Sequence, residues 1–304
     1  MNGNPVIGFI GLGLMGHGMA KNLRLAGYEL WVKGGRSRAP VEDLVNMGAR
    51  EAASPKEMAA SCDIIHLCLP NSAVIEQTLR GANGILAGAR PGLIVIDSST
   101  ADPASTLALA SEMAAVGGHF IDAPLGGTPM QAETGELTAM VGSSAAVLEQ
   151  VRPVIGAWAT TINHIGEVGS GHRMKLLMNF IGLSYGALFS EVVVLGKKIG
   201  ISPAKLREVI APSRMGSGFF DTFMAYVVDR DRNAHKFSIE NAAKDLRYLN
   251  RMALEAGVIN IIGGSALHYY AHAEATGHAG EYVPMLSDQV AALNGVDMEH
   301  QGER

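Results

Sequence analysis

Short apolar runs alternate with amphipathic stretches over the first half of the chain. Runs of strand length lie at residues 6–10, 29–32, 62–70, 92–99 and 119–124. Helical patterns separate them, at 17–27, 41–49, 74–79 and 103–117, and glycine ends several of these patterns. This alternation predicts a parallel sheet with helices on both faces. Two further strands are expected, at 136–142 and 160–166.

The second half shows only helical periodicity after Gly171, with glycine and proline between the patterns. An α/β domain over 1–165 and an all-α domain over 166–304 are therefore expected, with a hinge in 164–171. Helices are predicted at 172–199, 203–212, 217–228, 238–256, 262–276 and 284–293.

The helix expected from residue 172 onward is apolar enough to raise the question of a membrane span. Its stretch 176–196 nevertheless contains Asn179 and Glu191, and two lysines follow it. A helix that is apolar all round is also typical of the core of a large protein. The sequence favours this second interpretation, so no membrane association is expected.

Charge and cysteine usage narrow the class of protein further. The formal net charge of −5 provides no basic field for nucleic acid or an anionic membrane. Cys62 and Cys68 lie in or near an apolar run without metal-ligand spacing, which favours buried thiols in a reducing compartment. The N-terminus does not resemble a signal peptide. We therefore expect a cytoplasmic protein.

The first strand is followed by a G-x-G-x-x-G pattern, at Gly11, Leu12, Gly13, Leu14, Met15 and Gly16. The first glycine permits a tight turn, the second a close approach to a pyrophosphate, and the third close packing of helix on strand. The N-terminus of the following helix presents free N–H groups to phosphates. Because the pattern follows a strand and opens a helix, it predicts a Rossmann-type dinucleotide site rather than a structural turn.

The second strand ends in a turn that carries cations instead of an acid. Its residues are Lys33, Gly34, Gly35, Arg36, Ser37 and Arg38. An acid here would bind the ribose hydroxyl of NAD, whereas cations suit the 2′-phosphate of NADP. The turn favours NADP over NAD as the cofactor, although a solvated basic turn would look similar.

Lys175 and Asn179 share one face of an apolar helix, because they are four residues apart. A charge on an apolar face is costly unless it is paired or used. An ammonium can donate a proton to a carbonyl oxygen and stabilise its developing negative charge. The pair is a candidate catalytic acid with an orienting amide. A lysine that extends its charge to the surface is the alternative.

Five ordered motifs give the chain a family resemblance. They are GFIGLGLMG, IDSST, DAPLGGTPMQAETGEL, GSGHRMKLLMNF and AAKDLRYL. In order and separation these resemble the β-hydroxyacid dehydrogenase family, which includes 3-hydroxyisobutyrate dehydrogenases and tartronate semialdehyde reductases and is related to 6-phosphogluconate dehydrogenase. The resemblance implies an NAD(P)-dependent enzyme that interconverts a small β-hydroxy acid and its semialdehyde. It also implies a Rossmann-type domain with a helical domain that carries much of the subunit contact.

The resemblance also assigns residues. It implies that Lys175 is the catalytic lysine and that Asn179 is the asparagine one turn later. Lys244 matches a lysine near cofactor and active site, and Thr100 matches a threonine on the nicotinamide side. Leu69 and Pro70 match the loop after the fourth strand. No metal is implied.

The predicted substrate loop departs from the family pattern. The family reads D-x-P-V-S-G-G, whereas this chain has Gly126, Gly127 and Thr128 as its last three positions. Backbone N–H groups of the two glycines could still cradle an anion, and Thr128 could restore a hydroxyl. A G-x-T loop resembles the branch that contains sulfolactaldehyde reductase. The sequence therefore does not distinguish between several small anionic substrates.

Other readings of the sequence carry less weight. A scaffold protein that keeps the fold would be expected to lose the lysine, and imine-reducing relatives usually replace it. His268 and His272 have metal-ligand spacing without an obvious third ligand, which favours an exposed helix face. Ser217 lies in a loop without the strand–turn–helix context of a nucleophile. The many apolar helices predict a homodimer or homotetramer built through 172–300.

Overall fold

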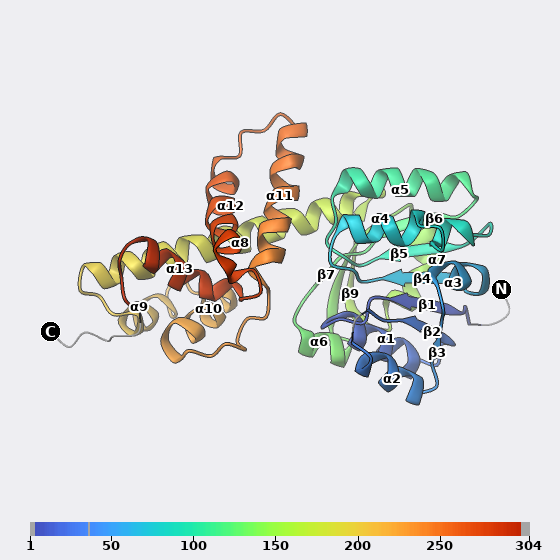
Figure 1. Cartoon of the computed structure of the whole chain (residues 1–304), viewed down its shortest axis with the longest axis horizontal. Coiled ribbons are helices and arrows are strands. Elements are labelled where there is room, and N and C mark those ends of the chain that lie inside the picture. Colours follow the sequence, from blue (N-terminus) through green and yellow to red (C-terminus); the bar gives the residue numbers. More distant parts are fainter. Residues whose placement is uncertain (1–3, 36, 299–304) are drawn as a thin grey trace. The chain divides into compact units, whose positions relative to one another are not determined.

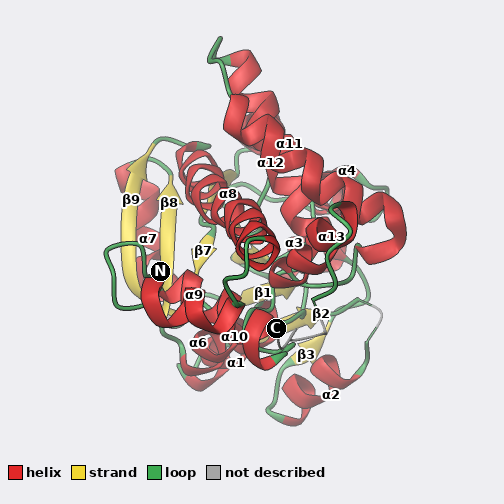
Figure 2. Ribbon diagram, turned by 90° about the vertical axis from the view of Figure 1, so that its left-hand side faces the viewer, coloured by secondary structure: helices red, strands yellow, loops and turns green. Residues whose placement is uncertain are grey.

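The computed structural model describes residues 4–35 and 37–298. The chain divides into two compact units, one up to Lys175 and one from Leu176 onward. The division falls inside helix α8 (Ser170–Lys198). Figures 1 and 2 show an α/β unit and a helical unit. The fold class predicted from the sequence is confirmed, whereas the domain limits 1–165 and 166–304 stay a prediction.

A mixed sheet organises the first unit. Its strand order is β3-β2-β1-β4-β5-β6-β8-β7, with β9 paired to β8. The run from β3 to β6 is parallel throughout, and β8 is antiparallel to β6. The strands are β1 (Ile7–Ile10), β2 (Leu30–Lys33), β3 (Arg50–Glu51), β4 (Ile64–Leu67), β5 (Ile94–Asp97), β6 (His119–Asp122), β7 (Leu125–Gly126), β8 (Leu137–Gly142) and β9 (Ala159–Gly166).

Helices cover both faces of this sheet, as the sequence predicts (Figure 1). One apolar cluster joins the strands to α1, α2 and α7, and a second joins them to α3, α4 and α5. Parallel strands buried on both faces need nearly continuous apolar runs, which explains the pattern of the first half. The helices are α1 (Gly16–Leu25), α2 (Ala39–Asn46), α3 (Pro55–Ser61), α4 (Ser72–Arg80), η1 (Ile85–Ala87), α5 (Pro103–Ala115), α6 (Pro129–Thr134) and α7 (Ala145–Ile155).

The second unit is helical in its described residues. Apolar residues of α8, α11, α12 and α13 form one core, and α10 supplies most of a second. The predicted helices are present, with small shifts at their ends. Besides α8, the elements are α9 (Pro203–Ile210), α10 (Gly218–Asp229), α11 (Ile239–Glu255), α12 (Ile261–Ala273), η2 (Glu274–His278), η3 (Val283–Met285) and α13 (Leu286–Leu293).

Among the described helices, α8 alone is long and apolar enough to cross a membrane. A third of its most apolar window is buried inside the protein. Length and apolarity of this kind are shared by spanning helices and by core helices of large proteins. The preference for a core helix therefore still rests on its polar residues.

Candidate functional site

The glycine loop between β1 and α1 has the geometry that a dinucleotide needs. Gly11 has φ of +100°, and a Cβ there would lie 2.2 Å from the carbonyl oxygen of Cys68. A Cβ on Gly16 would lie 1.9 Å from the carbonyl oxygen of Gly11. Gly13 is exposed, and nothing lies within 4 Å of a Cβ built on it. Two glycines are thus required by packing, while Gly13 leaves room for a phosphate to approach the backbone.

The start of helix α1 is open to an anion. Met15, the residue before the helix, makes no capping hydrogen bond, and the first turn contains no acid. Its early N–H groups and the positive end of the helix dipole are suited to a pyrophosphate. Leu12 is buried beneath this loop, and Leu14 is exposed. The residues fit the cofactor that the glycine pattern predicts.

The cationic turn after β2 has an acidic partner that no local sequence pattern predicts. Both terminal nitrogens of Arg38 bind the carboxylate of Glu51 in β3, at 2.5 and 2.9 Å. The hydrogen bond with Arg38 lowers the pKa of Glu51, and the same bond raises the pKa of Arg38. Lys33 Nζ donates to the carbonyl oxygen of Ala53 at 3.1 Å. Arg38 therefore already has a carboxylate partner in this turn.

The remaining cofactor candidates lie at the carboxyl ends of neighbouring strands. Ser37 is exposed, and Arg36 lies outside the described residues. Leu69 and Pro70 follow β4, and Thr100 follows β5. The N–H of Leu69 donates to Oγ of Ser99 at 2.9 Å, which joins the two loops. Strand order reverses between β1 and β4, and ligands of open α/β sheets bind at such a switch point.

The loop proposed to bind substrate leads into helix α6. Gly126 ends β7, and Gly127 has φ of +132°. Thr128 caps α6, because its hydroxyl accepts from the N–H of Gln131 at 3.3 Å. The Gln131 side chain accepts in turn from the N–H of Thr128 at 2.9 Å. The Thr128 hydroxyl thus has a structural role at the start of α6, besides the substrate contact predicted for it.

Helix α8 carries both catalytic candidates, with Lys175 one turn before Asn179. Asn179 Nδ2 donates to Oδ2 of Asp245 at 2.7 Å. The other oxygen of Asp245 lies 3.2 Å from Nζ of Lys244, which also lies above the ring of Tyr248. The buried Asp245 carboxylate thus contacts both Asn179 and Lys244, which are candidates from two separate sequence motifs. Its contact with Asn179 spans 66 residues of sequence, so no local pattern could predict it.

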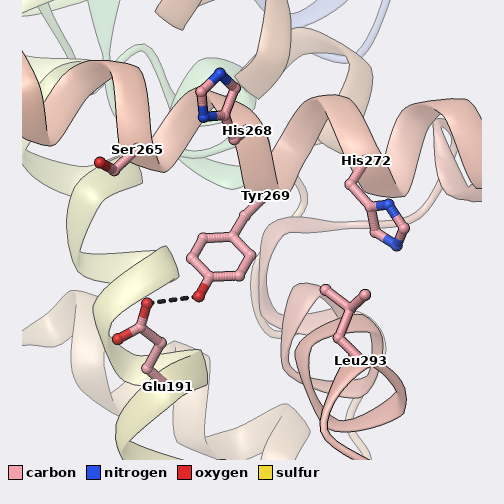
Figure 3. A pocket seen from close by; sticks show the side chains of 6 residues that line it. All are labelled: Glu191, Ser265, His268, Tyr269, His272 and Leu293. Carbon is pink, nitrogen blue, oxygen red and sulfur yellow. Dashed lines mark hydrogen bonds between the residues drawn. The ribbon is translucent and has the colours of Figure 1, made fainter.

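Two further sequence candidates have ordinary surroundings. Ser217 caps α10 by accepting from the N–H of Phe220 at 3.1 Å. His268 and His272 are exposed and line an open pocket, where Tyr269 donates to Glu191 at 2.6 Å (Figure 3). That hydrogen bond raises the pKa of Tyr269 to about 12.

Within residues 4–35 and 37–298, no group of three or more histidine, cysteine or acidic side chains could hold a metal ion.

Both cysteines lie in the described part of the chain, and neither forms a disulfide. Cys62 is buried, and burial raises the pKa of its thiol to about 12. Cys68 is partly buried.

A glycine loop of this geometry at the switch point of a parallel sheet defines a Rossmann-type dinucleotide-binding protein. Residues 6–166 match the NAD-binding domain of 6-phosphogluconate dehydrogenase. Residues 169–285 match the family described as NAD-binding of NADP-dependent 3-hydroxyisobutyrate dehydrogenase. The chain belongs to the β-hydroxyacid dehydrogenase family, whose members are NAD(P)-dependent oxidoreductases.

Individual relatives agree with this assignment. The chain is 36% identical to 2-(hydroxymethyl)glutarate dehydrogenase of Eubacterium barkeri, over 83% of this chain and 82% of that protein. It is 32% identical to 3-sulfolactaldehyde reductase of Escherichia coli, over 95% and 97%. A 3-hydroxyisobutyrate dehydrogenase structure from Mycobacterium tuberculosis, with L-serine, has a TM-score of 0.84 at 26% identity, covering 95% and 99%. These relatives make the chain an oxidoreductase and do not favour a non-catalytic scaffold or an imine reductase.

Proposed function

We propose that this protein reduces a small anionic semialdehyde to the corresponding β-hydroxy acid, with Lys175 as the proton donor. The observation that carries the proposal is the placement of Lys175 and Asn179 one turn apart on α8, with the Asn179 amide held by Asp245. The ammonium form of a lysine can donate a proton to the carbonyl oxygen as the hydride arrives. Its charge also stabilises the oxygen as negative charge develops there.

In this proposal Asn179 orients the lysine or the substrate and does not transfer the proton. Because its Nδ2 donates to Asp245, its carbonyl oxygen is presented as an acceptor on the other side of the amide. A hydroxyl or an ammonium in the site is a suitable donor to that oxygen. Lys244 neutralises part of the Asp245 charge at 3.2 Å, which keeps the buried carboxylate compatible with its surroundings.

The loop at 126–128 is proposed to bind the acid group of the substrate. Since Thr128 caps α6 and Gly126 pairs with Thr138 in the sheet, the candidate anion donor is the backbone N–H of Gly127. Backbone donors read negative charge more than the shape of one acid, so carboxylates and sulfonates are both suitable. The relatives above act on a glutarate derivative and on a sulfolactaldehyde, which agrees with an anion-binding loop of broad tolerance.

The cofactor is proposed to bind along the carboxyl ends of β1, β4 and β5. Gly11, Gly13 and Gly16 would receive the pyrophosphate, while Leu69, Pro70 and Thr100 would line the nicotinamide side. Ser37, Arg38 and Lys33 would meet the adenosine ribose, with NADP preferred over NAD. When bound, the reduced nicotinamide supplies the hydride.

Assembly and location complete the proposal. Ile181, Leu188 and Leu195 recur every seven residues along α8 and are 55%, 51% and 61% exposed. Apolar residues at that spacing form one stripe on a helix, which a second copy can cover. We therefore propose a homodimer or homotetramer in the cytoplasm, without nucleic acid or membrane partners.

A substrate panel assayed with both cofactors tests this function. Suitable members are glyoxylate and the succinic, tartronate, methylmalonate, 2-formylglutarate and sulfolactaldehyde-type aldehydes, each with NADPH and NADH. The proposal expects reduction of at least one anionic semialdehyde and little reduction of a neutral aldehyde of similar size. Equal rates with the neutral aldehyde would refute the anion-binding role of the loop. Reduction of cyclic imines in preference to every aldehyde would favour the imine reductase alternative.

A further inference from the structure

We infer that Asp122 is a positioning residue for Lys175, and the inference rests on the proposed function. Asp122 ends β6 and is completely buried. Its Oδ1 accepts from the N–H of Gly169 at 2.6 Å, and its Oδ2 accepts from the N–H of His172 at 2.7 Å. Helix α8 starts at Ser170. One carboxylate from the sheet therefore caps the helix that carries Lys175.

A carboxylate at this position stabilises the start of the helix. The first N–H groups of a helix have no partner within the helix and carry the positive end of its dipole. A buried carboxylate meets both needs with two charge-assisted hydrogen bonds. Most helices of this unit that have a side-chain cap take it from a residue next to the helix, as α3 does from Ser54. The cap of α8 comes instead from a strand 47 residues earlier.

Two glycines make room for this carboxylate. A Cβ on Gly142 of β8 would lie 2.4 Å from Oδ1 of Asp122. A Cβ on Gly171 of α8 would lie 2.8 Å from Oδ2 and 2.3 Å from the carbonyl oxygen of Met140. The sheet, the carboxylate and the first turn of α8 are thus in close contact. That closeness leaves little freedom for the helix to slide or rotate at this end.

A buried histidine completes the arrangement. His172 has no exposed surface, and its Nδ1 lies 2.7 Å from Oγ1 of Thr106. Its Nε2 faces Oδ2 of Asp97 at 3.8 Å, and Nδ1 lies 4.0 Å from Oδ2 of Asp122. Burial raises the pKa of Asp97. The ring and both carboxylates fill the space between the ends of β5 and β6 and the start of α8.

Lys175 follows His172 by three residues, close to one helical turn. A shift of α8 by one residue moves every later side chain about 1.5 Å along the axis and turns it by about 100°. Displacements near 1 Å at a reacting group cost about a hundredfold in rate. Asp122 therefore acts on turnover through the position of Lys175, without touching the substrate.

The test replaces the cap while keeping its size. Asp122→Asn removes the charge and leaves one suitable acceptor for two N–H groups. We expect turnover to fall about tenfold or more, with the KM for NADPH changed less than about twofold. Ser54→Ala, which removes the side-chain cap of α3 in the same unit, is the matched control and should keep its turnover. Unchanged turnover in a folded Asp122→Asn protein would overturn the inference.

A double-mutant cycle separates positioning from general damage. In a Lys175→Met background, Asp122→Asn should cost less than about twofold further, because the group that it positions is gone. Equal factors in both backgrounds would overturn the inference while leaving the proposed function intact. Normal turnover in Lys175→Met alone would refute the proposed function itself.

Thr106→Val provides a second route in case Asp122→Asn does not fold. It removes the hydroxyl at Nδ1 of His172 and keeps the shape of the side chain. A few-fold loss of turnover that disappears in the Lys175→Met background is expected. A loss of the same size in both backgrounds, or no loss at all, would contradict the inference.

Discussion

Asn179 of α8 donates from Nδ2 to Oδ2 of Asp245 of α11 across 2.7 Å. The bond fixes which end of the amide points away from α11, and the 3.2 Å contact with Lys244 balances the charge of Asp245. An asparagine held in this way is a rigid acceptor beside the predicted acid. The proposed division of labour between Lys175 and Asn179 depends on this bond.

Asp245→Asn should lower turnover about tenfold, since an amide at this position no longer fixes the orientation of Asn179. Asn179→Ala should cost a similar factor, and the two losses should not add because the groups act as one unit. Steady-state kinetics of the two single variants and the double variant measure this. Asp288→Asn, which removes the charge of the acceptor in the 2.5 Å bond from Tyr226 in the same unit, is the control for lost stability. Fully additive losses would contradict a shared role.

Cofactor preference should respond to the partner of Arg38. Glu51→Gln weakens the bidentate pair and makes the guanidinium more available to a 2′-phosphate. The KM for NADPH should fall about twofold to fivefold, with the KM for NADH nearly constant, because exposed ion pairs are weak. Arg38→Ala should change the NADPH value in the opposite direction. Glu42→Gln is the matched control. Oε1 of Glu42 lies 3.8 Å from Nε of Arg38, so Glu42 is a more distant partner of the same guanidinium than Glu51. Equal changes for both cofactors would rule out this role of Arg38.

Assembly should depend on the apolar stripe of α8. Ile181→Asp with Leu188→Asp places two charges on that stripe, which would be desolvated in an interface between copies. Light scattering at micromolar concentration should show a smaller particle than for the unchanged protein. Leu25→Asp alters an equally exposed leucine of α1 and should leave the particle size unchanged. A monomer before any substitution would refute the proposed oligomer.

Stability of the α/β unit should fall below neutral pH because of His66. This histidine stacks on Phe9 at 4.8 Å and is fully buried, and burial lowers its pKa to about 3. An unfolded chain takes up its proton near pH 6.5, whereas the folded protein takes it up near pH 3. Unfolding is therefore favoured by about 1.4 kcal/mol for each pH unit between these values.

His66→Phe removes the titrating ring and keeps an aromatic side chain against Phe9. Denaturant unfolding between pH 4 and pH 7 should then show a shallower fall of the unfolding free energy with acid than the unchanged protein. The same slope in both proteins would mean that His66 does not titrate on unfolding.

Patterns within short stretches of the sequence predict much of the secondary structure of this molecule. The roles of Gly11, Gly13 and Gly16 follow from one turn, so the sequence predicted all three. The helical patterns do not predict α3, α6 and α7, although Ser54, Thr128 and Ser144 cap these helices and mark their starts. Strand β3 has two residues, which is too short for any periodicity.

Partners that are far apart in the sequence cannot be predicted from local patterns. Glu51 approaches Arg38 because β3 lies beside β2, and Asp245 approaches Asn179 because α11 packs on α8. Asp122 reaches the start of α8 across the sheet. A residue type at a given position does not encode such contacts, because the fold alone brings the two segments together. The sequence therefore predicts candidate residues one by one, while the partners that contact them are set by the fold.

Turnover of Lys175→Met with the best semialdehyde and NADPH tests the central claim most directly. Methionine keeps the length of the side chain and removes its charge, so the protein should fold and bind NADPH with nearly unchanged affinity. A positioned acid contributes about a hundredfold or more, and turnover should fall by that factor. Near-normal turnover in a folded variant that binds NADPH would contradict the account and make Lys244 the next candidate for the acid.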